Sequence, residues 1–491
     1  MAFFLTFKGE PVNNDMALIF CYNPLAPRDD TLSLSKRPHT SSPVKPFNRD
    51  KTMKKSKPRT HKHKTMNKTP LAPVVANKEG EIFELEGFGA AAMAGDQPVL
   101  LTQGETIEMP YGSEMMMLPD RFPLVFNFDK FCFETLKTNP YNPEEPIHAV
   151  SVFNSPGYVN RYVAAYESAV KGALLPLFSY GATGWGKGGF RSAAICVDRE
   201  RRQDLRLMPR KGIVAGVEAM QKKYPDNRLM RHLEKCALIY SCPAAKNFFL
   251  GRFEAPLPTS QVCNANCMGC ISLQKTDNLA ACQDRISFTP EPHEIAQVCL
   301  EHIPKVKKSV ASFGQGCEGD PLTAFHVIEP AIRQVRETTD QGTINMNTNA
   351  GMPHQLEKLF DAGLDSLRVS MNSVRETCYT TYFRPKSYTF QDVVKSFEIA
   401  EQKDKFISIN YLNCPGVTDS EEEFEALNRF LSTHRVNMIQ WRNLNYDPLG
   451  YFKTMETAGG KSPALGMGFI IQELSQRFPH LIHGYFNPPV R

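Results

Sequence analysis

The sequence lacks the long apolar stretches that mark membrane and secreted proteins. No apolar run approaches the roughly 18 residues that a membrane-spanning helix needs. The first residues also lack the ordered basic, apolar and small-residue parts of a signal peptide. We therefore expect a soluble protein.

Cysteine is present, but not in the pattern of a disulfide-stabilised protein. The 13 cysteines are an odd number scattered over 491 residues, whereas disulfide frameworks are typical of short secreted chains. Three of them lie in one short loop, and residues 451–491 contain none. These features favour a reducing cytoplasm. The length favours two or more domains.

Positive charge is concentrated at the N-terminus. Residues 1–70 hold 14 Lys and Arg against 5 Asp and Glu. The whole chain has 57 Lys and Arg and 52 Asp and Glu, so residues 71–491 hold 43 basic and 47 acidic residues. The basic run at 51–68 has almost no apolar residues, so we predict that residues 1–70 form a disordered basic leader. The alternatives are a nucleic-acid-binding arm, or sequence upstream of a later start at Met53 or Met66. The slightly acidic remainder argues against a broad phosphate-binding surface, so nucleic acid is not the partner we expect.

Residues 71–250 are predicted to form an N-terminal α+β domain whose role the sequence does not indicate. Short strand-like segments, such as 81–85 and 194–197, alternate with turns rich in Pro and Gly. The stretch 181–188 nearly matches a phosphate-binding loop. However, Gly188 replaces the hydroxyl residue of that motif and a strand follows, so we interpret it as a glycine-rich turn.

A helix predicted over residues 227–238 closes this domain. It carries Cys236, and Cys242 follows six residues later. The pair suits part of a second metal cluster or the entrance of an active site. Two cysteines without further ligands are more often buried small apolar residues, and we favour that interpretation.

The next 200 residues or so repeat a strand and then a helix. Each apolar strand is followed by a segment with helical periodicity, and residues Ser420 and Glu423 predict a capping box before the last of these helices. Strands that alternate with helices in this way pair in parallel through crossover connections. The six predicted strands are 257–262, 309–313, 343–346, 366–370, 406–411 and 437–441.

The chain's most specific motif lies at the end of the first of these strands. Cys263, Cys267 and Cys270 have the spacing C-x3-C-x2-C, so three thiolates can point at one soft metal centre. Structural zinc normally has four ligands in paired spacings, and no second pair follows. An iron–sulfur cluster with one open coordination position therefore fits better than zinc.

This spacing resembles the signature of the radical S-adenosylmethionine (SAM) superfamily, here as a bacterial-type subgroup with an extra N-terminal domain. The resemblance covers about residues 255–445 and implies a partial (β/α)6 TIM-like barrel as the core domain (residues 251–450), followed by a C-terminal tail (451–491). It implies a 4Fe-4S cluster on the three cysteines, SAM on its open iron, and an electron donor such as flavodoxin or ferredoxin. The absence of cysteine after residue 450 argues against a C-terminal auxiliary-cluster domain.

In parallel sheets with crossover helices, ligands bind at the carboxyl ends of the strands. The segments at those strand ends in this chain are polar and rich in glycine. The segment 314–322 is similar to the family's Gly-Gly-Glu-Pro stretch, which receives the amino group of SAM. Two extra residues put Glu318 or Asp320 at the acidic position, and we prefer Glu318. A plain Gly-rich turn or helix-capping Asn residues are the alternatives. The residues expected to contact SAM are Met268, Gly314, Gly316, Glu318, Asn347, Asn349, Ser370 and Asn372. Trp441, Arg442 and Asn443 are expected at the barrel mouth near the substrate, although Trp441 also suits the core.

The sequence therefore predicts an α/β enzyme that cleaves SAM reductively to a 5′-deoxyadenosyl radical, with the substrate and any catalytic residue unassigned. Two other functions fit the same features. One is RNA modification that uses the basic leader. The other is a non-catalytic iron–sulfur scaffold or electron carrier, whose cluster would not respond to SAM.

Overall fold

The structure is a computed structural model that describes residues 68–170, 172–274, 279–459 and 462–491. All but the last three residues of the predicted basic leader lie outside these ranges. No helix within the described ranges is long and apolar enough to cross a membrane.

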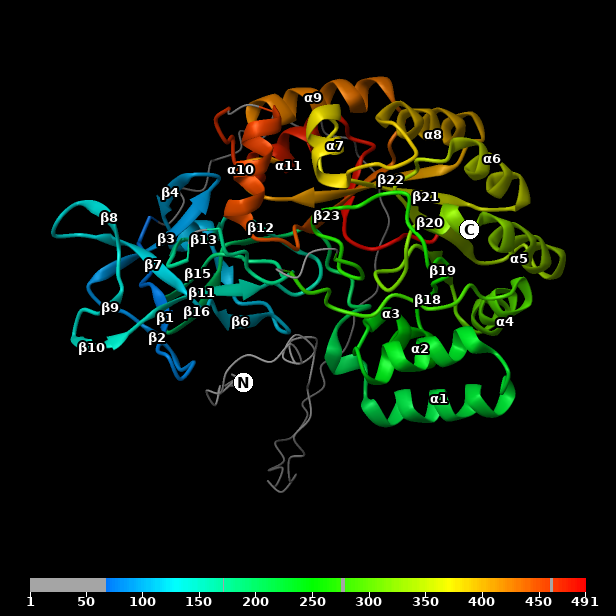
Figure 1. Ribbon diagram of the computed structural model, residues 1–491, viewed down its shortest axis with the longest axis horizontal. Coiled ribbons are helices and arrows are strands. Elements are labelled where there is room, and N and C mark those ends of the chain that lie inside the picture. The colour runs from blue at the N-terminus through cyan, green and yellow to red at the C-terminus, as the bar shows by residue number, and fades with distance from the viewer. Residues whose placement is uncertain (1–67, 171, 275–278, 460–461) are drawn as a thin grey trace, which may run out of the picture.

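The N-terminal half is built from short antiparallel strands (Figure 1). They pair in small sheets, of which the largest have the orders β13-β3-β7-β14, with β4 and β8 paired to it, and β2-β1-β11-β6. The strands are β1 (Val74–Ala76), β2 (Ile82–Glu84), β3 (Phe88–Ala94), β4 (Gln97–Leu100), β5 (Ile107–Glu108), β6 (Glu114–Met117), β7 (Arg121–Asn127), β8 (Cys132–Thr135), β9 (Thr138–Asn139), β10 (Asn142–Pro146), β11 (His148–Phe153), β12 (Tyr158–Asn160), β13 (Val163–Ala164), β14 (Tyr166–Ser168), β15 (Thr183–Gly186), β16 (Gly189–Ser192) and β17 (Ala194–Cys196).

The stretch that nearly matches a phosphate-binding loop is a β-hairpin. Strands β15 and β16 pair antiparallel, and Lys187 and Gly188 between them have φ of 55° and 72°. Two successive residues with positive φ are typical of the tight turns that join twisted hairpin strands. The interpretation of this stretch as a glycine-rich turn is confirmed.

Three helices connect this region to the parallel sheet: α1 (Arg210–Lys223), α2 (Arg228–Leu238) and α3 (Pro243–Phe249). Asn227 begins α2 as its N-cap by accepting a hydrogen bond from the backbone N–H of Met230. Their apolar residues belong to the same buried cluster as those of the parallel sheet and its helices. The domain boundary expected at residue 250 lies between α3 and the first strand of the sheet. The helices before that boundary share their buried apolar cluster with the sheet after it.

The second half is a seven-stranded parallel sheet with the order β18-β19-β20-β21-β22-β23-β24 and helices along its outside (Figure 1). Its strands are β18 (Glu254–Leu257), β19 (Val310–Phe313), β20 (Thr343–Thr348), β21 (Ser366–Met371), β22 (Phe406–Asn413), β23 (Met438–Asn443) and β24 (Ile482–Gly484). Its helices are α4 (Pro292–His302), α5 (Phe325–Thr338), α6 (Pro353–Ala362), α7 (Glu376–Phe383), α8 (Phe390–Gln402), α9 (Glu421–Thr433), α10 (Pro448–Gly459) and α11 (Met467–Arg477).

The predicted fold class, α/β with a partial (β/α)6 TIM-like barrel preceded by an α+β domain, is confirmed, with two differences. The first strand is Glu254–Leu257 rather than residues 257–262, so the segment 258–262 belongs to the loop that follows it. Residues 451–491, expected as a C-terminal tail, contain α11 and the seventh strand, β24, which pairs in parallel with β23.

Two predicted helix ends can be compared with the structure. Ser420 caps α9 as expected, but Glu423 does not return the bond of a capping box. Its carboxylate instead accepts hydrogen bonds from Ser373, Val374 and Arg375 at the end of β21, so a tertiary contact replaces the local one. Helix α6 ends at Gly363 in the left-handed region, with φ of 117°.

The N-terminal domain lies against the carboxyl ends of β22 and β23. The backbone N–H of Asn160 donates to Asn443 Oδ1 at 2.8 Å, and Asn443 Nδ2 donates to the carbonyl of Tyr158 at 3.0 Å. Asn413 Nδ2 donates to the carbonyl of Asn160 at 2.8 Å. The domain therefore covers one side of the sheet edge at which the predicted site residues lie.

Candidate functional site

Two loops meet at the carboxyl end of the parallel sheet. The cysteine loop (residues 258–272) leaves β18, and the glycine loop (residues 314–320) leaves β19. Since β18 and β19 are adjacent and parallel, both loops emerge at the same edge. The three predicted metal ligands lie on the first loop, and Gly314, Gly316 and Glu318 lie on the second.

The two loops are in direct backbone contact. The N–H of Gly319 donates to the carbonyl of Ser260 at 2.7 Å, and the N–H of Asp320 donates to the carbonyl of Val262 at 3.0 Å. A Cβ atom on Gly319 would lie 1.8 Å from the oxygen of Val262. Glycine is therefore required at 319 for the glycine loop to lie this close to the cysteine loop.

Helix α7 holds the cysteine loop from the other side. The N–H groups of Asn266 and Met268 donate to the carbonyls of Phe383 and Tyr382, each at 3.0 Å. Met268 and Tyr382 are both buried. The loop is thus fixed between the end of α7 and the glycine loop.

The three thiols differ in their surroundings. Burial raises the pKa of Cys267 well above its usual range, and burial with the nearby Asp320 raises the pKa of Cys263 to about 11. Arg285 Nη2 donates to Cys270 Sγ at 3.6 Å. Burial therefore favours the protonated form of Cys263 and Cys267 when no metal centre is bound.

Three cysteine thiols on one loop are a donor set that can hold an iron–sulfur cluster. Two thiolates on one zinc ion lie about 3.8 Å apart. Among the described residues, one group brings three ligand atoms within 4.8 Å of one another, and it does not contain Cys263, Cys267 or Cys270. A wider spacing is what a multi-iron cluster needs, because each thiolate binds a different iron. Asn264 Nδ2, in the same loop, is buried without a hydrogen-bond partner.

Glu318 is buried and its carboxylate is occupied by the chain itself. Oε1 accepts from the N–H groups of Gly314 and Gln315 at 2.8 and 2.7 Å. Oε2 accepts from both the N–H and the hydroxyl of Thr259 and from the N–H of Ser260. Burial raises the pKa of Glu318 to about 7 against these donors. Five donors saturate a carboxylate, so Glu318 ties the end of β18 to the start of the glycine loop.

Asp320 plays a similar part between the glycine loop and β20. Its carboxylate accepts from the hydroxyl of Thr348 at 2.7 and 2.9 Å and from the N–H of Asn349 at 2.7 Å. Asn349 Nδ2 in turn donates to Asn264 Oδ1 at 2.6 Å. The ends of β18, β19 and β20 are therefore joined through one buried polar network.

The remaining predicted residues separate into two groups. Asn347 Nδ2 donates to the carbonyl of Gly314 at 3.0 Å, which places both at the site. Ser370 lies in register with Asn410 on the neighbouring strand. Asn372 points instead toward α10, where its Nδ2 contacts the Tyr451 hydroxyl at 3.1 Å. A Cβ on Gly316 would meet the side chains of Ile271 and Gln283, so this glycine packs beside the cysteine loop.

Polar side chains that the sequence prediction missed fill the sheet's inner face. Arg368 Nη1 donates to Gln440 Oε1 at 2.9 Å, and Gln440 Nε2 donates to Asn487 Oδ1 at 3.0 Å. Burial lowers the pKa of Arg368 to about 9, so it stays charged at neutral pH. Arg368 Nε and Asn410 Oδ1 are buried without partners. The available signal was the alternation of Arg368 and Ser370 with apolar residues along β21.

The three residues expected at the barrel mouth lie in three different surroundings. Trp441 is fully buried and its Nε1 donates to His483 Nδ1 at 3.0 Å, so it belongs to the core. Asn443 binds the N-terminal domain. Arg442 stacks on the ring of Tyr485 at 3.6 Å.

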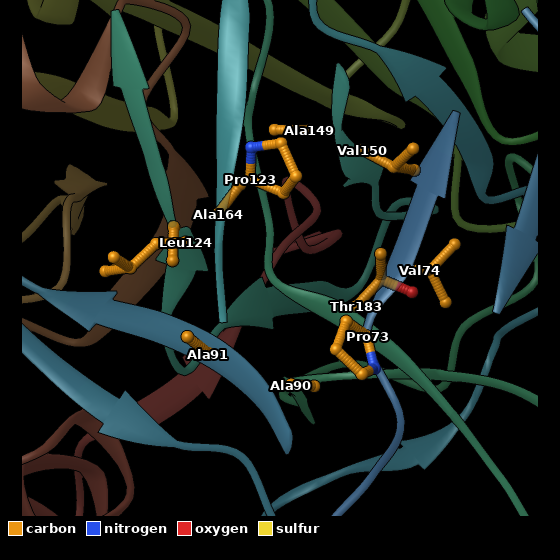
Figure 2. Close-up of a pocket in the computed structure, with 11 residues that line it drawn as sticks. Pro73, Val74, Ala90, Ala91, Pro123, Leu124, Ala149, Val150, Ala164 and Thr183 are labelled. Atoms are coloured by element: carbon orange, nitrogen blue, oxygen red, sulfur yellow. The ribbon is translucent and has the colours of Figure 1, made fainter. Parts of the chain in front are cut away.

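A small cavity lies elsewhere, inside the N-terminal domain (Figure 2). Its lining is mainly Pro, Val, Leu and Ala side chains from several strands, with Thr183 among them. It has room for about one water molecule. It is too small to hold SAM or a substrate.

Comparison with known proteins identifies the barrel. Residues 257–430 match the family model described as Radical SAM superfamily. A comparison with curated proteins gives no match. Among solved structures, the chain is similar to methylornithine synthase (PylB), with 15% identity over 57% of this chain and 74% of that chain and a TM-score of 0.32. It is also similar to anSMEcpe with bound AdoMet, with 15% identity over 39% of this chain and 52% of that chain and a TM-score of 0.30. A third similar structure is a radical SAM methyltransferase from Sphaerobacter thermophilus, with 13% identity over 46% of this chain and 63% of that chain and a TM-score of 0.32.

The chain spans only about half to two thirds of the last two proteins, and the identities and TM-scores are too low to assign any of the three activities to it. The family match rests on the segment that begins at the end of β18 and ends within α9. This chain contains a radical SAM domain, which the family model places at residues 257–430.

Proposed function

We propose that Cys263, Cys267 and Cys270 hold a 4Fe-4S cluster and that the protein cleaves SAM to a 5′-deoxyadenosyl radical. Enzymes of this superfamily use such a cluster, SAM and an external reductant. The observation that supports the proposal most is the direct contact between the cysteine loop and the glycine loop at the end of the parallel sheet. When bound and reduced, the cluster supplies the electron that cleaves SAM.

The chain's own residues prepare this site before any ligand arrives. The backbone contacts of Gly319 and Asp320 fix the start of the cysteine loop, and the carbonyls of Tyr382 and Phe383 fix its centre. Ordering the three thiols in advance reduces the conformational entropy lost when the metal centre binds. To hold the cluster, the buried thiols of Cys263 and Cys267 would have to give up their protons.

We propose that SAM lies over the glycine loop, with Met268, Gly314, Gly316 and Asn347 nearest to it. Backbone carbonyls of this loop are suited to accept hydrogen bonds from the amino group of SAM. Glu318 and Asn349 already bind other parts of the chain, so we assign them the role of positioning the loop ends. Ser370 lies at the end of β21 in register with Asn410, and Asn372 contacts Tyr451 of α10.

The source of the electron and the place of action belong to the same proposal. A low-potential carrier such as flavodoxin or ferredoxin suits the reductive cleavage of SAM. Three thiols that must stay reduced suit the cytoplasm.

The test is release of 5′-deoxyadenosine by anaerobically reconstituted protein with SAM and a strong reductant. We expect about four iron per chain and deoxyadenosine release in the wild type, and neither in Cys267→Ala. Cys299→Ala, which changes a buried cysteine in α4, is the matched control and should keep both. A reducible cluster without deoxyadenosine would support the iron–sulfur scaffold instead. Zinc at the three cysteines, with no visible absorption, would contradict the proposal outright.

A further inference from the structure

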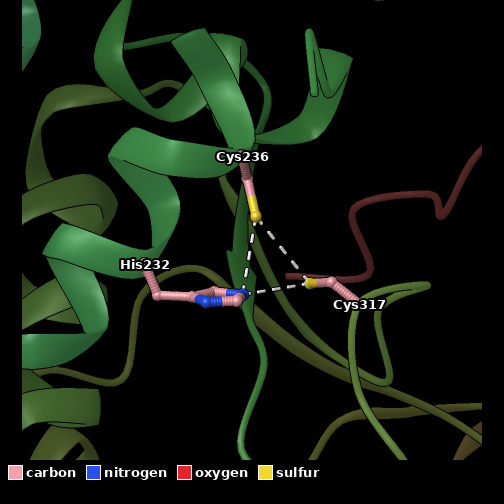
Figure 3. A group of neighbouring side chains, drawn as sticks. All are labelled: His232, Cys236 and Cys317. Carbon is pink, nitrogen blue, oxygen red and sulfur yellow. Dashed lines mark hydrogen bonds between the residues drawn. The ribbon is translucent and has the colours of Figure 1, made fainter. Parts of the chain in front are cut away.

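A second cluster of potential metal ligands lies beside the glycine loop. His232, Cys236 and Cys317 bring one nitrogen and two sulfurs within 4.8 Å of one another, and Figure 3 shows the three side chains pointing toward a common centre. Cys236 and Cys317 are buried, and His232 is half-buried. None of the three is needed for the 4Fe-4S site proposed above.

The fold places these residues together from distant parts of the chain. His232 and Cys236 are four residues apart on α2, so both project from the same face of the helix. Cys317 lies in the glycine loop, directly before Glu318. Sequence spacing gives no sign of the third residue, because 81 positions separate it from Cys236.

The distances match the edges of a tetrahedron around one metal ion. Zinc, with Zn–S of about 2.3 Å and Zn–N of about 2.0–2.1 Å, holds two sulfurs about 3.8 Å apart and a sulfur and a nitrogen about 3.5 Å apart. Here the two sulfurs are 3.9 Å apart, and His232 Nε2 is 3.4 Å from Cys317 Sγ and 3.5 Å from Cys236 Sγ. We propose that His232, Cys236 and Cys317 bind a zinc ion.

The chemistry of the three groups agrees with this geometry. The group offers two cysteine sulfurs and one imidazole nitrogen, which are ligand atoms that zinc prefers in proteins. Thiolate and neutral imidazole are the forms that bind zinc. Three protein ligands leave the fourth tetrahedral position to water or to a further group.

A purely apolar role or a disulfide would account for less of this geometry. Buried apolar cysteines do not require an imidazole nitrogen facing both sulfurs. A disulfide between Cys236 and Cys317 would need the sulfurs to approach from 3.9 Å to about 2.05 Å and would leave His232 without a role. The experiment below distinguishes both from a zinc site.

The proposed ion would connect α2 to the glycine loop. Ile286 N donates to the carbonyl of Cys317 at 2.8 Å, and the neighbouring Glu318 binds the ends of β18 and β19. A metal bond at Cys317 would therefore restrain the loop on which SAM is proposed to lie. The zinc site itself does not depend on the proposed function.

The experiment measures both metals in full-length, cluster-loaded protein by mass spectrometry. We expect about one zinc in addition to about four iron per chain. Cys236→Ala, Cys317→Ala and His232→Gln should each lower zinc at least tenfold with the cluster's visible absorption retained. Cys299→Ala, a buried cysteine outside this group, is the matched control and should keep its zinc. His232→Gln changes the most accessible ligand, and circular dichroism checks that it is folded.

A triple variant separates this inference from the proposed function. Changing Cys263, Cys267 and Cys270 together to Ala should remove the iron and leave about one zinc per chain. In cobalt-grown protein, the same triple variant should show the intense visible bands of tetrahedral cobalt with thiolate ligands, and adding Cys236→Ala should abolish them. The inference is overturned if wild type carries no zinc, if the zinc content is equal in the ligand variants, or if peptide mapping finds a Cys236–Cys317 disulfide. About eight iron per chain would also overturn it, because the site would then hold a second cluster.

Discussion

Substituting Gly319 by Ala should separate the two loops that form the candidate site. The new Cβ would lie 1.8 Å from the carbonyl oxygen of Val262, whereas such contacts are essentially never under 3.0 Å, so the loops must move apart by at least 1.2 Å. This movement breaks the bonds from Gly319 to Ser260 and from Asp320 to Val262. Two backbone hydrogen bonds contribute about 0.5–1.5 kcal/mol each and overpacking costs about 1–3 kcal/mol, so we expect a loss of about 2–6 kcal/mol in unfolding free energy.

The assay combines urea unfolding of the cluster-free protein with iron content after anaerobic reconstitution. Because Cys263 follows Val262 directly, Gly319→Ala should also lower iron well below about four per chain. The matched control is Gly189→Ala in β16, where a Cβ would meet nothing within 4 Å. Full iron content and wild-type stability in Gly319→Ala would refute the claim that the contact between the loops builds the site.

Three further predictions concern the buried polar network, a buried histidine and the basic leader. Thr348→Val removes the hydroxyl that donates to Asp320 and should lower the unfolding free energy of the cluster-free protein in urea by about 1–3 kcal/mol. Thr348→Ser keeps a hydroxyl and should retain most of that stability. Equal stability of the two variants would contradict the role of the hydrogen bond. Burial lowers the pKa of His302 to about 4 from its ordinary 6.5, so below pH 6.5 the unfolded chain gains a proton that the folded chain does not take up until about pH 4. Between pH 7 and pH 5, wild type should therefore lose about 2 kcal/mol relative to His302→Gln in urea unfolding, and parallel pH profiles would argue against it. Protein that starts at Met66 should match the full chain in iron content and melting temperature, and a lower value of either would show that the basic leader takes part in folding.

The parallel sheet could be predicted because its signals are local. Apolar runs of strand length alternate with helical periodicity, and Gly363 ends a helix where its left-handed conformation is needed. The strand β24 was missed because it has three residues, of which Ile482 is exposed. Nothing in so short a segment indicates that it pairs with β23.

The candidate site was predictable only where its residues are close in sequence. The spacing of Cys263, Cys267 and Cys270 is visible in one loop, whereas the partners of Glu318 lie as far as 59 residues away. The sequence suggested a carboxylate free to bind a ligand, and the structure shows one that five donors already occupy. Pairings across the fold depend on how loops approach one another, which neither periodicity nor composition encodes.

The proposed cluster has three cysteine ligands and one iron open to SAM, and the electron paramagnetic resonance spectrum of the reduced protein tests this arrangement most directly. We predict that adding SAM to wild type changes the spectrum of the reduced cluster, since SAM becomes a ligand of the open iron. We predict the same change in the matched control Cys299→Ala and no cluster signal in Cys263→Ala. A cluster spectrum that is identical with and without SAM would contradict the claim and favour an iron–sulfur scaffold.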